Sequence, residues 1–519
     1  MMKHLALCLW LLACGLSPVC AQGGTKLEAE AANYSNCQLV QGNNYSGGKA
    51  LELKEGNARI AFNFQAAEQG KYTVSVGCDG LYGDKVANLA VNGSNGTFVV
   101  KGFGETTVGT YFMNKGTNSI VITPSWTWFR IDYIRVEKAG SELAFNIAKS
   151  PVDAAAADCA RKMYSFLYEN FGRKTISGIM TGDMSSANGN VTQHDDVKAV
   201  YQMSGKYPAL VGFDFMNGTG TSDRWAKEYT AAALALAKDL YRRGGLPNFT
   251  WHWRDPSRKT WEFYSDKCSM KISDALNADG TWNTSSTLYK NIIKDIDEVA
   301  DYLLDLQSEG VACIFRPLHE ASGGWFWWGR EGAAPFIKLY RLLFDEMVRV
   351  KGVHNVIWVW NAGENDTDWN PGDDYYDIVS ADIYNADFDY SSCYVAFDRL
   401  KALTGGKKII ALSENGPIPD IELEIKEEAV WSWWMPWYQT WNGNFVSKTS
   451  REEWTKCMNH ERVITLDDLS AGWDAYSGIQ TPVAGAAHGE PIYDLQGRRL
   501  SEAPRKGLYI RGGKKYVGR

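Results

Sequence analysis

Between residues 154 and 473, short apolar runs alternate with stretches of helical periodicity, and this alternation strongly limits the folds open to the chain. One helical stretch runs from Ile292 to Leu306 and ends at Gly310. Eight runs have the length and composition of buried strands: Thr175–Ile179, Ala209–Phe213, Pro247–Trp251, Ala312–Pro317, Val356–Trp360, Ile378–Ile383, Lys408–Ser413 and Ala429–Trp434. Eight such repeats predict a (β/α)8 TIM barrel over residues 147–476. A doubly wound open sheet is disfavoured, because no glycine-rich phosphate loop follows the first strand.

The residues before the barrel have a different pattern. Short β-type runs such as Arg59–Phe64, Tyr72–Val76 and Ile131–Val136 alternate between polar and apolar side chains and are separated by Gly, Asn and Ser. Strands at this spacing predict a β-sandwich of the jelly-roll type over residues 25–138. The chain is therefore expected to have several domains.

Both ends of the chain carry expected targeting features. Residues 1–21 combine a basic start, the apolar stretch Leu5 to Leu12 and small residues near Ala21, which predicts a signal peptide and a secreted or cell-surface protein. The sequence Leu11-Leu12-Ala13-Cys14 leaves a lipid-anchored outer-membrane form or a periplasmic form as alternatives. No other run approaches the roughly 20 apolar residues of a membrane span. Residues 479–519 form a basic tail in which a small β-hairpin unit is expected.

Charge and cysteine content exclude several classes of function. The net charge of −7 argues against nucleic acid as the main partner and favours a neutral ligand. Seven cysteines follow the leader, an odd number with neither a disulfide framework nor zinc-ligand spacing. Cys37 and Cys78 could pair, whereas Cys313 is expected to be a buried free thiol.

Two predicted strands are each followed by a glutamate, at the barrel face where reactive groups gather. Glu320 follows the fourth strand and Glu414 the seventh, and these strands face each other across a barrel mouth. Two carboxyl groups without a metal suit glycoside hydrolysis, with retention of configuration if they lie about 5 to 5.5 Å apart and inversion if the gap is about 6.5 to 9.5 Å. Zinc protease chemistry is excluded because Gly323 stands where a second histidine ligand is needed. No G-x-S-x-G motif surrounds a serine.

Tryptophan is concentrated in the same part of the chain. Eighteen of the 21 tryptophans lie between Trp225 and Trp473, and a loop directly after Glu320 contains Trp325, Trp327 and Trp328. Indole rings stack against the C–H faces of sugar rings, so this concentration predicts a sugar-binding cleft, although part of the run is expected to pack at the barrel rim.

The motif Arg316-Pro317-Leu318-His319-Glu320, together with Trp325-Phe326-Trp327-Trp328-Gly329, resembles glycoside hydrolase family 26 across the central domain. The family consists mostly of retaining β-mannanases. The resemblance implies that Glu320 is the acid/base and Glu414 the nucleophile. Arg316 and Tyr384 are implied to hold the nucleophile. An indole of the eighth strand is implied to contact the substrate, and Trp434 is favoured for it over Trp431 and Trp433. The other residues implied to contact the substrate are His252, His319, Trp325 and Trp328.

The N-terminal module resembles carbohydrate-binding module family 35. The resemblance implies a structural Ca²⁺ held by Glu28, Glu30 and Asp132, three acids that could instead be simply solvated. Trp126 and Trp128 precede the last strand and are the expected sugar-stacking platform.

These features together predict a retaining endo-β-1,4-mannanase that acts on β-mannan, glucomannan or galactomannan without a catalytic cofactor. The alternatives are a β-1,3-xylanase or mixed-linkage β-glucanase of the same family, and a catalytically inactive polysaccharide-binding protein. The basic tail resembles the C-terminal sorting domains of secreted Bacteroidetes proteins, which implies contact with an export machinery.

Overall fold

The computed structural model describes residues 24–140, 143–363, 366–439, 444–469, 473, 492–493, 499–500, 507–511 and 514–518. The chain divides into one unit that ends at Glu142 and a second that begins at Leu143. Each unit is described by itself.

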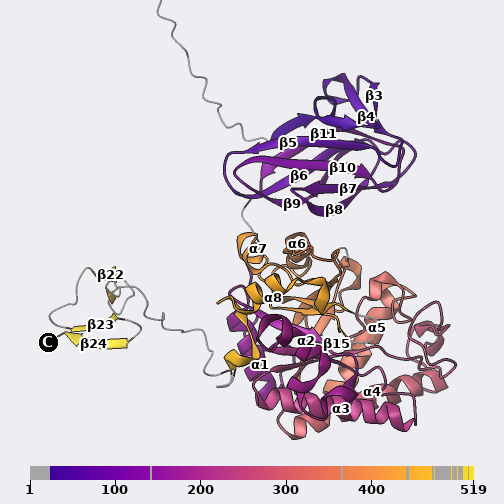
Figure 1. Ribbon diagram of the computed structural model, residues 1–519. Helices are drawn as coiled ribbons and strands as arrows, with labels where there is room; N and C mark the ends of the chain where they lie inside the picture. Colours follow the sequence, from indigo (N-terminus) through magenta and orange to yellow (C-terminus); the bar gives the residue numbers. More distant parts are fainter. Residues whose placement is uncertain are drawn as a thin grey trace, which may run out of the picture. The chain divides into compact units, whose positions relative to one another are not determined.

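The N-terminal unit is a sandwich of two antiparallel sheets (Figure 1). One sheet has the order β3-β4-β11-β6-β9, with β1 also paired to β11, and the other has the order β2-β5-β10-β7-β8. The strands are β1 (Thr25–Glu28), β2 (Asn33–Ser35), β3 (Gln38–Gln41), β4 (Lys49–Leu53), β5 (Arg59–Ala66), β6 (Gly70–Asp79), β7 (Lys85–Val91), β8 (Ser94–Val100), β9 (Gly104–Met113), β10 (Gly116–Pro124) and β11 (Phe129–Lys138). Alternate residues of β5, Ile60, Phe62 and Phe64, are buried, as two packed sheets require.

The second unit contains a closed ring of eight parallel strands, which confirms the predicted barrel. The strands are β12 (Thr175–Met180), β13 (Leu210–Asp214), β14 (Leu246–Trp251), β15 (Cys313–Pro317), β16 (Val356–Asn361), β17 (Ile378–Ile383), β18 (Ile409–Asn415) and β19 (Trp433–Pro436). Pairing of β12 with both β13 and β19 closes the ring. Gly178 of β12 permits this closure, since a Cβ there would lie 2.6 Å from the carbonyl oxygen of Trp434.

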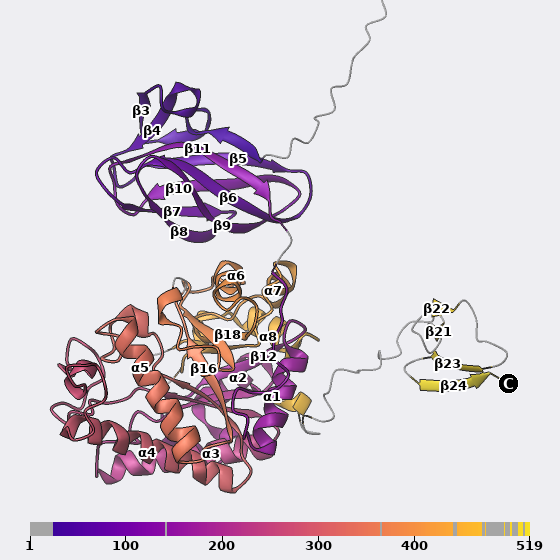
Figure 2. The ribbon, with the colours of Figure 1, turned by 180° about the vertical axis from the view of Figure 1, so that it is seen from behind.

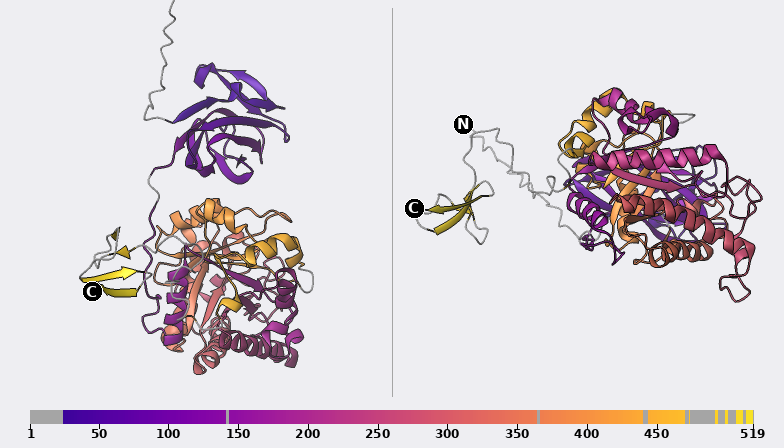
Figure 3. Two further views of the ribbon diagram at one scale, coloured as in Figure 1. Left: turned by 60° about the vertical axis from the view of Figure 1, so that its left-hand side comes forward. Right: turned by 90° about the horizontal axis from the view of Figure 1, so that it is seen from below.

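Helices surround the strand ring (Figures 2 and 3). They are α1 (Asp158–Asn170), α2 (Asp195–Ser204), α3 (Arg224–Arg242), α4 (Thr287–Ser308), α5 (Ala333–Phe344), α6 (Tyr394–Leu403), α7 (Ile421–Lys426) and α8 (Arg451–Met458), and a π-helical turn at Asp345–Val350 follows α5. Helix α4 shows why the pattern forms a helix: its buried face repeats through Ile292, Ile296, Val299 and Leu303, and Gly310 follows it with φ of +69°.

Short 3-10 segments complete the two units. They are η1 (Ala29–Ala31), η2 (Ser46–Gly48), η3 (Met184–Ala187), η4 (Val191–Gln193), η5 (Ile272–Ala275), η6 (Ala321–Gly323), η8 (Thr367–Trp369), η9 (Val446–Lys448) and η10 (Leu466–Leu469). The short strand β20 (Val463–Ile464) pairs with β12 beside the ring.

The predicted signal peptide and much of the basic tail lie outside the described residues. Within the tail, β21 (Ile492–Tyr493), β22 (Arg499–Leu500), β23 (Gly507–Arg511) and β24 (Lys514–Gly518) form a small antiparallel sheet, in which β23 and β24 pair directly. No helix among the described residues has the length and apolar character needed to cross a membrane.

The cysteines of the described residues are free thiols. A Cys37–Cys78 disulfide is therefore not formed, because Cys37 directs its thiol to the carbonyl oxygens of Ser35 and Arg59. Cys313 is fully buried in β15 as expected.

Candidate active site

Glu320 is placed at the barrel mouth by a turn directly after β15. Leu318 and Glu320 both have positive φ, 53° and 52°, a conformation that residues with side chains rarely adopt. The turn is held by the backbone N–H of Glu320, which donates to Asn361 Oδ1 at the end of β16, 2.7 Å away. Backbone strain of this kind gathers at functional sites, where the surrounding contacts fix it.

Glu414 lies within β18, and both of its carboxylate oxygens have donors. Arg316 of β15 is fully buried and forms an ion pair with Oε1, and the Tyr384 hydroxyl donates to Oε2 over 2.6 Å. The same guanidinium donates to Asp382 Oδ2 at 2.8 Å. Arg316 and Tyr384 thus orient Glu414 from two sides.

Asp382 is a third carboxylate of the site that was not predicted from the sequence. It accepts hydrogen bonds from Arg316, from the Asn361 amide at 2.9 Å and from the Ser413 hydroxyl at 2.7 Å. Its position at the end of β17, on the same barrel face as the two glutamates, was the signal available in the sequence.

Glu320, Asp382 and Glu414 each place a carboxylate oxygen within 4.8 Å of the other two. This separation of Glu320 and Glu414 is shorter than the gap of about 6.5 to 9.5 Å that holds a water molecule in inverting glycosidases. The geometry therefore suits direct attack by one carboxylate.

Burial and mutual charge disturb the protonation of the two glutamates. Burial first, and then the charge of Asp382, raises the pKa of Glu320, and the same two causes raise the pKa of Glu414. Glu414 receives hydrogen bonds or an ion pair on both oxygens, from Arg316 and Tyr384, whereas Glu320 accepts one from the Trp325 indole. When the pair carries one negative charge, that charge is therefore better stabilised on Glu414, and Glu320 keeps the proton.

His252 and His319 lie side by side in the same mouth. Asp214 Oδ2 is 2.6 Å from His252 Nδ1, and the Nε2 atoms of the two histidines are 3.2 Å apart. Burial, with the charge of Arg316, lowers the pKa of His319, so this ring is neutral at neutral pH. The carboxylate of Asp214 fixes the His252 ring, leaving its Nε2 toward His319.

The aromatic loop after Glu320 divides into one exposed and two buried indoles. Trp325 is 49% exposed, and its Nε1 donates to Glu320 at 2.8 Å. Trp327 and Trp328 are fully buried, and Trp328 donates to the carbonyl oxygen of His319. The expectation that Trp328 contacts substrate is therefore corrected, because its ring packs inside the loop against Phe326.

A second loop supports the aromatic loop. Between β14 and α4, Tyr264 forms an antiparallel bridge with Phe326, the Ser265 N–H donates to the Trp325 carbonyl, and the Trp327 N–H donates to the Phe263 carbonyl. Trp325 is thus held by backbone bonds from a separate part of the chain.

The eighth strand requires another correction. Trp434 is fully buried and meets Trp454 of α8 with a ring-centroid distance of 5.7 Å, so it packs between barrel and helix and is not open to a sugar. The strand continues to Pro436, and the residue just beyond it is Trp437. This ring is half-buried and lies 5.9 Å from the His252 ring, which makes Trp437 the indole at the mouth.

The N-terminal module exposes the two predicted platform residues. Trp126 and Trp128 are 60% and 48% exposed, and Trp128 has φ of 72°. The Lys54 ammonium lies 5.4 Å from the Trp128 ring centroid, so a sugar stacked on this ring would have a cation beside it.

The same module contains a cavity of about 330 Å³ that sequence reasoning missed. Its aromatic walls come from Tyr45, Phe103 and Tyr133, and its polar groups include Lys26 and Glu105. The lining comes from five separate segments of the module, so no short motif indicated it.

The three predicted calcium ligands surround the turn at Ser46. The Ser46 N–H donates to both oxygens of Asp132, at 2.9 and 3.0 Å, and its hydroxyl donates to Glu28. Glu28 Oε2 and Glu30 Oε2 are buried without a hydrogen-bond partner. Burial raises the pKa of Asp132, with a smaller contribution from Glu28. Buried oxygens without partners fit a hard cation.

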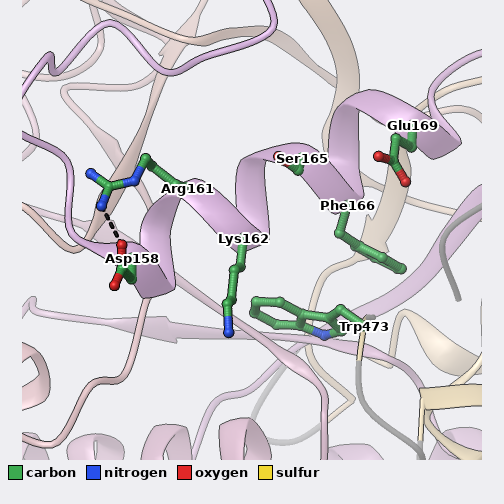
Figure 4. A pocket seen from close by; sticks show the side chains of 7 residues that line it. All are labelled: Asp158, Arg161, Lys162, Ser165, Phe166, Glu169 and Trp473. Carbon is green, nitrogen blue, oxygen red and sulfur yellow. Dashed lines mark hydrogen bonds and ion pairs between the residues drawn. The ribbon is translucent and has the colours of Figure 1, made fainter. Parts of the chain in front are cut away.

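A second cavity, of about 270 Å³, lies on α1 (Figure 4). Its lining includes none of the catalytic group, by which we mean Glu320, Asp382 and Glu414 with Arg316 and Tyr384. Trp473 forms one wall, stacks on Phe166 and donates to the carbonyl oxygen of Gly244. Trp473 packs against the barrel core, which is consistent with a catalytic domain that extends at least to this residue.

A (β/α)8 barrel whose strand ends bring two glutamates together, beside the exposed indole of Trp325, is the arrangement of a glycoside hydrolase. Residues 152–468, more than half of the chain, match the model of glycosyl hydrolase family 26, and the chain belongs to that family. Residues 25–139 match the carbohydrate binding module of family 35.

The chain is similar to individual mannanases, two of which match most of its length. The chain is 32% identical over 471 residues to a mannan endo-1,4-beta-mannosidase of Thermothelomyces thermophilus, covering 86% of this chain and 91% of that protein. It is similar to the crystal structure of a Podospora anserina GH26-CBM35 beta-(1,4)-mannanase, with a TM-score of 0.57, 29% identity and coverage of 87% and 100%. A beta-mannanase from a symbiotic protist of the termite Reticulitermes speratus, complexed with gluco-manno-oligosaccharide, is 38% identical, with a TM-score of 0.56 and coverage of 62% and 98%.

Proposed function

We propose that the protein is a retaining endo-β-1,4-mannanase that hydrolyses β-mannan, glucomannan or galactomannan. The single observation that carries the proposal is the pair Glu320 and Glu414, with carboxylate oxygens within 4.8 Å of each other and with different hydrogen-bond partners. Two relatives that each cover most of this chain bear mannanase names, which supports the choice of substrate.

In the first step, a Glu414 oxygen attacks the anomeric carbon as the glycosidic bond breaks, and Glu320 gives its proton to the leaving oxygen. In the second step, ionised Glu320 takes a proton from water, whose oxygen attacks the anomeric carbon and releases Glu414. Arg316 and Tyr384 hold Glu414 in its ionised form between turnovers. Trp325 holds the carboxyl of Glu320 by a hydrogen bond from its indole.

Replacement of each glutamate tests these roles. Glu414→Ala is expected to abolish hydrolysis of every substrate. Glu320→Ala is expected to form a glycosyl-enzyme from a substrate with a good leaving group and then stall until azide is supplied. NMR of the first product is expected to show retained configuration, and an inverted product would refute the assignment of Glu414.

The alternative substrates are separated by a reducing-sugar assay on mannan, lichenan and β-1,3-xylan. Release from mannan alone supports the proposal, and release from lichenan or β-1,3-xylan but no mannan would point to the mixed-linkage glucanase or the xylanase. An inactive binding protein has no need for donors on both oxygens of Glu414, so the geometry favours an enzyme.

We propose that the N-terminal module holds the same polysaccharide near the barrel. The cavity beside Phe103 suits one sugar ring, and Trp126 and Trp128 offer an exposed stacking surface. Affinity electrophoresis of the full chain on galactomannan is expected to show weaker retention for Phe103→Ala or Trp128→Ala. Unchanged retention of both variants would exclude this part of the module as the binding surface.

We propose that Glu28, Glu30 and Asp132 hold a structural Ca²⁺ in this module. The buried, unpartnered oxygens of Glu28 and Glu30 support the proposal. Calcium is expected to raise the melting temperature of the chelated full chain, and Glu30→Gln is expected to remove this effect. A melting temperature that is equal in calcium and in chelator would contradict the proposal.

We also propose that the protein is exported, with residues 479–519 as the signal for the export machinery. The basic composition of the tail and the β23–β24 hairpin support a small recognition unit. Cell fractionation tests the proposal: deletion of the tail is expected to leave the enzyme in the periplasm, and unchanged export would contradict it.

A further inference from the structure

An exposed aromatic residue stands on the loop between β17 and α6, outside the catalytic group. Phe388 is 58% exposed and has φ of +66°. Both features oppose what folding alone favours, because the ring stays in water and the backbone takes a conformation that residues with side chains rarely adopt. Backbone strain of this kind clusters at ligand-binding sites.

Contacts with the segment that follows β19 fix this loop. The Phe388 N–H donates to the Lys448 carbonyl at 2.9 Å, and the Lys448 ammonium forms an ion pair with Asp387 at 3.3 Å. The position of Phe388 is therefore set by two segments rather than by a free loop.

Aromatic rings lead from the catalytic carboxylate toward this loop. Tyr384, whose hydroxyl binds Glu414, has its ring centroid 5.5 Å from that of Phe445. The Lys448 ammonium lies 4.3 Å from the Phe445 centroid. Phe445 thus lies next to Tyr384, Lys448 lies next to Phe445, and the backbone bond from Phe388 joins its loop to Lys448.

We infer that Phe388, Phe445 and Lys448 form a distal subsite that binds a backbone sugar of the polysaccharide beyond the cleavage point. This inference rests on the proposed function. The apolar C–H face of a β-linked pyranose stacks on the phenyl rings, and the Lys448 ammonium and Asp387 carboxylate bind its hydroxyl groups. A neutral sugar fits better than an anionic one, since Asp387 neutralises Lys448.

Kinetics with long and short substrates test the subsite in the full-length protein. Phe388→Gly removes the ring and also relieves the positive φ, so loss of folding is not expected. Its KM for mannohexaose is expected to rise roughly tenfold with kcat nearly unchanged, a change typical of one lost stacking contact. Activity on an aryl β-mannobioside is expected to stay the same if this substrate ends before the subsite. Phe388→Trp, which keeps an aromatic ring, is expected to retain the low KM of the wild type.

Val350→Ala is the matched control, because Val350 is exposed at the end of the π-helical turn, away from the strand ends. Equal KM values for wild type, Phe388→Gly and Val350→Ala on mannohexaose would overturn the subsite while leaving the mannanase proposal intact. A wild-type protein that cleaves no mannan would refute the proposed function instead. In that case calorimetry with hexasaccharides of other β-linked backbones, on wild type and Phe388→Gly, decides the subsite: equal affinities overturn it, and weaker binding by the variant supports it.

Discussion

Removal of the Tyr384 hydroxyl tests how the protein keeps its nucleophile ionised. The hydroxyl donates to Glu414 Oε2 over 2.6 Å, and burial, with the charge of Glu414, raises the pKa of Tyr384, so the donor remains protonated at working pH. A hydrogen bond to a charged group contributes about 1.5 to 3 kcal/mol. Taken over its whole surface, Tyr384 is nonetheless 45% exposed, so water replaces part of the lost hydrogen bond and the lower end of this energy range applies. Tyr384→Phe is therefore expected to reduce kcat/KM roughly tenfold.

The pH profile gives the more specific test. The Tyr384 hydrogen bond acts to lower the pKa of Glu414, so its loss raises this pKa. The acidic limb of kcat/KM, which reports ionisation of the nucleophile in the free enzyme, is expected to move to higher pH. Tyr340→Phe is the matched control, because that buried hydroxyl donates to the Val359 carbonyl outside the site. An acidic limb that stays in place in Tyr384→Phe, with less than a twofold loss of activity, would refute the reasoning.

Other replacements test the remaining charges and aromatic rings. Asp382→Asn removes a charge that raises the pKa of Glu320, so the basic limb of the kcat/KM profile is expected to move to lower pH. Trp434→Ala is expected to lower the free energy of unfolding by about 3 to 5 kcal/mol in urea titrations, whereas Trp437→Ala is expected to reduce kcat/KM with a smaller change in stability. Burial raises the pKa of Glu424, so ionisation of this carboxyl is unfavourable in the folded state and the stability of the protein falls as the pH rises. Glu424→Gln is therefore expected to stabilise the protein at pH 8 and not at pH 4, as measured by urea unfolding.

The sequence predicted the barrel and the position of its two glutamates because strand ends are regular points in this fold. Buried barrel strands are apolar on both faces, so Trp431, Trp433 and Trp434 showed no alternation that could fix which ring points outward. The prediction of Trp434 failed for this reason, and Trp437 became visible only when the strand was seen to end at Pro436. The prediction that Trp328 contacts the substrate failed for a related reason, because the sequence does not show which ring of an aromatic loop turns inward.

Other features depend on contacts between distant segments. The cavity of the N-terminal module is assembled from five segments, and the role of Asp382 depends on its distance from Arg316 and Asn361. Neither relation appears in local composition or periodicity. The calcium ligands and the sugar contacts of His252 and His319 stay predictions, although the structure places both histidines in the mouth.

The backbone bonds between the Tyr264 loop and the Trp325 loop have a consequence for the evolution of the enzyme. Trp325 is the hydrogen-bond donor to the proton-donating carboxyl, and its own carbonyl is fixed by Ser265. An insertion or deletion in the Tyr264 loop would therefore shift the acid strength of Glu320 without touching the residue itself. Relatives that diversify this loop are therefore expected to differ in the optimum pH of hydrolysis even where both glutamates are unchanged.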